Sequence, residues 1–277
     1  MDIPTSLYEH YKAKVRPHTK NYSVYATDEN DTEIIADLAN TLVSQSDELG
    51  LDDFEKIHFI ATFVQHLAYT IDEETTGFDD YARYPIETLV ERGGDCEDTA
   101  ILLGKIMTEL DYDVVLVRLP THIALGVLEG EKFSGTYYPY HDKHYFYLET
   151  TGEAGRIGMV PDEYKGMLAY IFDFSPWAVI EHKWTGQRQR ATYDLHVTIE
   201  NQGTASADGC SVLAGFDAGE ERIWNTSKSE TFDLEPGDAI QIDMTLPLPE
   251  AEHTRLLVFI MKNGKSIDRS YSAWFDE

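Results

Sequence analysis

The stretch Gly93-Gly94-Asp95-Cys96-Glu97-Asp98-Thr99-Ala100 places one cysteine between a glycine pair and an apolar run. The apolar residues recur at helical spacing as far as Leu110, so we expect Cys96 to lie in the first turn of a helix. A thiol there faces unpaired backbone N–H groups and the positive end of the helix dipole, which favour the thiolate. The sequence therefore predicts a reactive cysteine with a lowered pKa.

Helical periodicity precedes this cysteine, and strand periodicity follows it. Residues 32–49 carry an apolar helical face, and a second helix over 54–67 follows the pair Asp52 and Glu55, which fits a capping box. Alternating apolar residues predict antiparallel strands over 114–119, 122–127 and 145–150. Helices first and strands afterwards indicate an α+β domain.

The composition and the apolar periodicity of the sequence change again near residue 185. Residues 184–190 are polar and locally basic, which predicts a linker. Beyond them lie short alternating runs separated by turn signals such as Asn263-Gly264. We therefore expect two domains, the α+β domain over 1–184 and an all-β, immunoglobulin-like sandwich over 190–277.

The charge balance narrows the choice of partners. A net charge of −28 excludes a nucleic-acid partner, because phosphate binding depends on Lys and Arg. The same acidity suits a protein that stays soluble in high salt. The second cysteine, Cys210, falls in an expected strand and is interpreted as a core residue. The polar N-terminus does not resemble an export signal, so the compartment stays open, and an extracytoplasmic protein whose signal or anchor is absent here is one alternative.

A thiol nucleophile needs a base, and the base needs an orienting group. His122 begins a strand on which it shares a face with Ala124 and Gly126, and we expect the end of a helix to approach this face of small side chains. Glu149 ends an aromatic strand and supplies a carboxylate. Cys96, His122 and Glu149 are therefore the candidate catalytic set.

These residues resemble the transglutaminase-like cysteine enzymes, which share a papain-like core with a helix carrying Cys and strands carrying His and Asp. The matching segments are 94–98, 122–127 and 147–151, within a resemblance over roughly residues 30–170. The resemblance implies that Cys96 is the nucleophile, His122 the base and Glu149 the orienting acid, although the family usually has Asp there. It is closest to archaeal proteins of this type with a C-terminal sandwich.

The resemblance also bears on the oxyanion and on cofactors. Animal transglutaminases use a Trp upstream of the cysteine for the oxyanion, whereas the first Trp here is Trp177. We therefore expect the Cys96 backbone N–H and the Gln65 amide as donors. Asp95 and Glu97 resemble the acids through which calcium-dependent bacterial transglutaminase-like cysteine proteases bind Ca²⁺, and hard carboxylate oxygens suit that ion. We expect no other cofactor. The acidic loop 72–80 either supplies further ligands or is simply solvated.

The sequence thus predicts a thiol-dependent acyl-transfer enzyme acting on amide bonds of a protein or peptide substrate. Hydrolysis is favoured over cross-linking, because no tryptophan-walled tunnel is evident to keep water out. Two alternatives stay open. One is a transglutaminase that joins an amide to an amine. The other is a catalytically silent scaffold or binding module, in which the C-terminal domain recognises a protein or glycan.

Overall fold

The computed structural model divides into two compact units, Met1–Ser175 and Pro176–Glu277, and describes residues 2–152, 155–250 and 253–276. The division lies upstream of the linker predicted over 184–190. Most of that stretch belongs to strand β8 (Ile180–Arg188), which pairs with β9 (Thr192–Asn201). Its polar residues reflect an exposed edge strand rather than a connection between domains, since the second half of β8 is mostly exposed.

The first unit contains all the described helices. They are α1 (Thr5–Ala13), α2 (Thr32–Glu48), α3 (Asp53–Gln65), α4 (Asp72–Thr75), α5 (Pro85–Glu91) and α6 (Cys96–Glu109), with 3₁₀ turns η1 (Tyr22–Tyr25) and η2 (Asp162–Tyr164). The predicted capping box is confirmed, because Glu55 N–H donates to Asp52 and Asp52 N–H donates to Glu55. None of the helices among the described residues is long and apolar enough to cross a lipid bilayer.

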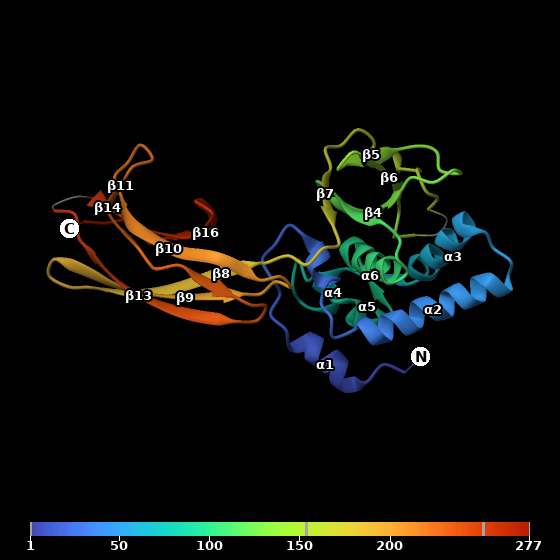
Figure 1. Ribbon diagram of the computed structural model, residues 1–277, viewed down its shortest axis with the longest axis horizontal. Coiled ribbons are helices and arrows are strands. Elements are labelled where there is room, and N and C mark those ends of the chain that lie inside the picture. Colours follow the sequence, from blue (N-terminus) through green and yellow to red (C-terminus); the bar gives the residue numbers. More distant parts are fainter. Residues whose placement is uncertain (1, 153–154, 251–252, 277) are drawn as a thin grey trace. The chain divides into compact units, whose positions relative to one another are not determined.

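A five-stranded antiparallel sheet completes the first unit. Its order is β5-β6-β4-β3-β7, from β3 (Val114–Leu119), β4 (His122–Leu128), β5 (Tyr137–Tyr140), β6 (Lys143–Leu148) and β7 (Tyr170–Asp173). A separate parallel pair joins β1 (Ala68–Tyr69) to β2 (Gly93–Gly94). The predicted α+β class with antiparallel strands is confirmed. Figure 1 shows α6 between this sheet and the other helices, and α6 contacts β3, β4, α2 and α5.

The two faces of β4 have different neighbours. Ala124 packs in a cluster with Val115, Val117, Tyr145 and Tyr147, and among the described side chains none from α6 belongs to it. Since α6 packs on β3 and β4, it covers the opposite face of the sheet. The body of α6 therefore lies on the face opposite to His122 and Ala124, and only its first residue, Cys96, comes near the start of β4. Bulky side chains of β3 and β6 fill the space above the small residues instead.

The second unit consists of antiparallel strands. Besides β8 and β9 they are β10 (Ala207–Asp217), β11 (Ile223–Lys228), β12 (Phe232–Leu234), β13 (Ala239–Pro247), β14 (His253–Thr254), β15 (Leu256–Lys262), β16 (Lys265–Tyr271) and β17 (Phe275–Asp276). One sheet runs β13-β9-β8 and another β11-β10-β15-β16, with β12 on β10. Alternate residues such as Val197 of β9 and Val212 of β10 meet in one core, which includes Cys210 as predicted. The immunoglobulin-like topology stays a prediction.

Candidate active site

Helix α6 begins at Cys96, the position predicted from the sequence. Asp98 turns back to accept a hydrogen bond from the Asp95 N–H at 3.2 Å, which fixes the start of the helix. A Cβ added at Gly94 would overlap the Asp98 side chain, so the close approach of these two segments requires glycine there. Local sequence therefore places the thiol at the first helical position.

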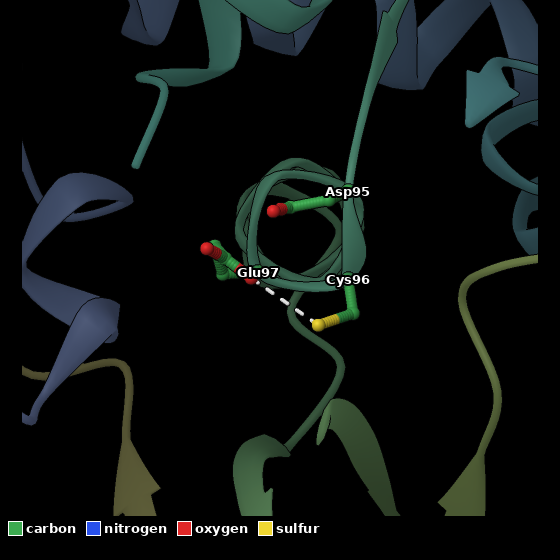
Figure 2. A group of neighbouring side chains, drawn as sticks. All are labelled: Asp95, Cys96 and Glu97. Carbon is green, nitrogen blue, oxygen red and sulfur yellow. Dashed lines mark hydrogen bonds between the residues drawn. The ribbon is translucent and has the colours of Figure 1, made fainter. Parts of the chain in front are cut away.

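The electrostatic surroundings of Cys96 differ from the prediction. Its Sγ hydrogen bonds with Glu97 Oε2 at 3.2 Å, and Figure 2 shows these groups directed at each other at the start of α6. Burial, and then the charges of Glu97 and Asp95, raise the pKa of the Cys96 thiol. The predicted lowering by the helix terminus is therefore wrong, because desolvation and two adjacent carboxylates outweigh the backbone dipoles.

His122 and Glu149 form the buried pair that the sequence suggested. The imidazole Nε2 lies 3.1 Å from Glu149 Oε1 and 3.0 Å from Oε2, and each residue is 7% exposed. The acid lies one residue beyond the end of β6 rather than within a strand. Glu149 has one more methylene group than the Asp expected from the family resemblance, and its carboxylate reaches the imidazole from this position.

Several donors hold the Glu149 carboxylate in its ionised form. Tyr147 donates its hydroxyl to Oε2 at 2.6 Å, and Oε1 accepts from Thr150 N and Thr151 N at 3.0 Å and from Thr151 Oγ1 at 2.8 Å. Burial alone would raise the pKa of Glu149. The hydrogen bond and charge of His122, with the bonds from Tyr147 and Thr151, outweigh burial and lower the pKa to about 2.

The backbone joins the thiol to the histidine. The Ile123 N–H lies close enough to the Cys96 sulfur to favour the thiolate and so to lower the pKa of the thiol, although burial and the two carboxylates outweigh it. The Ile123 nitrogen is covalently bonded to the His122 carbonyl carbon, so the sulfur lies beside the His122 backbone. Because Glu149 engages Nε2, the nitrogen that remains for the thiol is Nδ1, the ring nitrogen nearer the backbone.

Gln65 is placed differently from the oxyanion donor that the sequence suggested. Its Nε2 donates to Glu149 O at 2.8 Å and to Gly155 O at 3.2 Å, so both amide hydrogens serve the backbone that carries the acid. The Gln65 side chain therefore braces the Glu149 segment, and no amide hydrogen remains for an oxyanion.

Carboxylates gather beside the nucleophile. Ligand atoms of Asp95, Cys96 and Glu97 lie within 4.8 Å of one another, and so do those of Asp72, Asp80 and Glu97. Burial and the charge of Glu97 raise the pKa of Asp95 to about 8, and burial raises that of Glu97. Asp95 Oδ1 is buried and hydrogen bonds to no described residue. The acidic loop 72–80 thus converges on the residues flanking the cysteine.

Arg83 joins this loop to α6 and was not singled out in the sequence. The guanidinium is fully buried and donates through Nη1 to Asp72 Oδ1 and Asp98 Oδ2, both at 2.6 Å. It also donates to Glu91 Oε2 at 2.8 Å and to Thr75 Oγ1 at 2.6 Å. In the sequence, Arg83 is a single arginine after an acidic loop and belongs to no periodic pattern, so its role is visible only in the tertiary structure.

Tyr164 is the other contact that the sequence did not suggest. Its ring lies parallel to the His122 imidazole, with centroids 4.4 Å apart and an interplanar angle of 3°. It comes from η2, which follows residues 155–161, a stretch outside the described helices and strands. The structure thus brings together His122, Glu149 and Tyr164, and Cys96 lies within electrostatic range of Tyr164.

Comparisons with known proteins assign this chain to no family. No family model matches it, and no curated protein matches it. LapG of Legionella pneumophila is a structural neighbour at 20% identity and a TM-score of 0.34, over 51% of this chain and 83% of that one. EGTA-treated LapG gives the same score, with 81% of that chain covered.

β-Glucosidases are also found among the similar structures. The enzyme 3B from Thermotoga neapolitana, in complex with α-D-glucose, is 15% identical with a TM-score of 0.25, over 40% of this chain. The match covers only 16% of that protein's length. All of these TM-scores lie below 0.5, and none of the likenesses defines the fold of this chain.

Proposed function

We propose that this chain is a transglutaminase-like cysteine hydrolase that cleaves amide bonds in a protein or peptide substrate. The observation that carries the proposal is the buried His122–Glu149 pair, which adjoins two groups that interact with Cys96, the Ile123 N–H and Tyr164. A buried imidazole that is oriented by a carboxylate and adjoins a thiol is the arrangement nucleophilic catalysis needs.

The proton path follows from the ring geometry. Nε2 is held by Glu149, so Nδ1 takes the thiol proton as Cys96 Sγ attacks the substrate carbonyl carbon. The carbonyl oxygen becomes an oxyanion, which the Cys96 N–H can stabilise because the first N–H groups of a helix have no intrahelical acceptor. The imidazolium then protonates the leaving amine. Water attacks the thioester, gives its proton to His122, and regenerates the thiol with release of the acid.

A calcium site at Asp95 and Glu97 belongs to the same proposal. The donors are carboxylate oxygens, Asp72 and Asp80 add further oxygens near Glu97, and one buried Asp95 oxygen bonds to no described residue. This set fits a hard divalent cation. A bound cation would supply positive charge beside the thiol. Calorimetric titration with Ca²⁺ should show binding that the double variant Asp95→Asn, Glu97→Gln abolishes, and binding that survives would place the ion elsewhere.

One observation favours the alternative of a silent binding module, namely the raised pKa of Cys96. In that case residues 176–277 would recognise a protein or glycan partner, with the first unit as a scaffold. Alkylation by iodoacetamide with peptide mapping separates the two functions. We expect Cys96 to react faster than the buried Cys210, and His122→Ala to abolish this advantage.

The matched control is His144→Ala. His144 also pairs with a glutamate, Glu129, at 3.2 Å, but this pair is exposed and lies apart from the thiol. The His144→Ala variant should therefore leave the reactivity of Cys96 unchanged. If Cys96 is alkylated slowly, and at the same rate in the wild type and in His122→Ala, both with and without added Ca²⁺, the result would contradict the enzyme proposal and support the scaffold.

A further inference from the structure

One face of the candidate base is covered by an aromatic ring. Tyr164 stacks on His122 with centroids 4.4 Å apart and planes within 3° of parallel. His122 is 7% exposed, so little of its imidazole reaches solvent. The stack and the Glu149 hydrogen bond act on the same ring from different directions, one on its face and one on its edge.

The segment that carries Tyr164 is anchored to the sheet. Before it, Gly158 N–H donates to Tyr147 O at 2.6 Å, and Val160 is buried in the cluster that contains Tyr147. Pro161 then starts the 3₁₀ turn, with the Tyr164 N–H bonded to Pro161 O at 3.0 Å. The Tyr164 ring itself packs against this cluster. Its position over His122 is therefore set by the fold rather than by chance side-chain placement.

We propose that Tyr164 is a positioning residue for the reaction: its ring fixes the plane of the His122 imidazole, so that Nε2 stays on Glu149 while Nδ1 faces Cys96. This inference rests on the proposed function. The Glu149 bond restrains one nitrogen but leaves the ring free to tilt about that bond. A parallel ring at stacking distance blocks the tilt and keeps water off the His122–Glu149 hydrogen bond.

The stack also favours the charged intermediate. The face of an aromatic ring is electron-rich and attracts a cation, so it stabilises the imidazolium that forms when His122 takes the thiol proton. Both effects belong to the ring face and not to the hydroxyl. Phenylalanine should therefore replace Tyr164, whereas leucine or glutamine should not.

The test uses the full chain and needs no identified substrate. Iodoacetamide alkylation of Cys96 is followed by mass spectrometry in Tyr164→Phe, Tyr164→Leu and Tyr164→Gln, and ¹⁵N NMR reports the His122 tautomer. We expect Tyr164→Phe to match the wild type, with the proton on Nε2. We expect the non-aromatic variants to react about tenfold more slowly and to show both tautomers, since an aligned base contributes at least that factor. A purely structural role would not change the tautomer of a variant that melts like the wild type.

The outcomes distinguish the two proposals. If His122→Ala has no effect on Cys96 alkylation, the proposed function fails. If His122→Ala abolishes the reactivity but a folded non-aromatic Tyr164 variant keeps both the rate and the single tautomer, only the positioning role is overturned. A slow Tyr164→Phe would also overturn it, because the hydroxyl would then carry the effect. Two non-aromatic variants are used so that one with an unchanged melting temperature decides the comparison.

Discussion

Replacing Glu149 with glutamine removes a buried charge whose stabilising partners are known. In the folded protein the pKa of Glu149 falls from its ordinary 4.5 to about 2, because the bonds and charge of His122, Tyr147 and Thr151 outweigh burial. Each tenfold change in proton affinity corresponds to about 1.4 kcal/mol, so the ionised carboxylate contributes about 3 kcal/mol to the free energy of unfolding. Glu149→Gln should lose about this amount near neutral pH.

The pH dependence has a definite sign. The folded-state pKa lies below the unfolded one, so the contribution is complete above about pH 4.5 and disappears as the pH falls toward 2. The difference in stability between wild type and Glu149→Gln should therefore narrow over that interval. Protonation of other carboxylates changes both proteins equally and cancels in the comparison.

Two spectroscopic signals separate the units in a urea titration. All the described helices lie in the first unit, whereas the four tryptophans, Trp177, Trp184, Trp224 and Trp274, lie in the second. Far-ultraviolet circular dichroism thus follows the first unit, and tryptophan fluorescence follows the second.

Glu129→Gln is the matched control for this titration. It breaks the exposed pair with His144 and should cost about 0.5 kcal/mol or less. A loss that is the same at acid and neutral pH, or that is confined to the fluorescence transition, would refute the reasoning.

Three further outcomes are expected. Arg83→Met leaves buried carboxylates without their cation and should destabilise the first unit by about 3–5 kcal/mol, measured by circular dichroism in urea. Gln65→Ala leaves two backbone carbonyls without their donor and should cost the same unit about 1–3 kcal/mol, whereas an unchanged midpoint would remove its bracing role. Brief chymotrypsin digestion should cut at the exposed Trp177 before it cuts at Trp184 in β8. Earlier cleavage at Trp184 would support the prediction of a linker over 184–190.

The parts of the fold that were predictable depend on local physics. The start of α6 at Cys96 and the capping box at Asp52 follow from neighbouring residues, since caps and helical periodicity act within a turn or two. The strands over His122 and its neighbours follow from alternation in the same way. The pairing of His122 with Glu149 also followed from two local patterns at strand ends.

What could not be predicted depends on contacts between distant segments. The raised pKa of Cys96 results from burial and from the charges of Glu97 and Asp95. The sequence shows these acids beside the helix start, which acts in the opposite direction, but it does not show the burial. The prediction of a linker near residue 185 was wrong, because an exposed edge strand and an interdomain linker have a similar polar composition. Tyr164 and Arg83 reach their partners through irregular segments, for which no periodicity exists to be read.

The buried Arg83 ties the helix start beside Cys96 to the assembly of three helices. Its guanidinium binds Asp72, Asp98 and Glu91, which belong to three different helices, and Asp98 in turn caps the helix start beside Cys96. These bonds cannot form until the segments have met. A nascent or damaged polypeptide would lack these bonds, and with them the fixed start of the helix beside Cys96. Under the proposed function, incompletely folded copies would present an ordinary thiol, rather than an aligned nucleophile, to their surroundings.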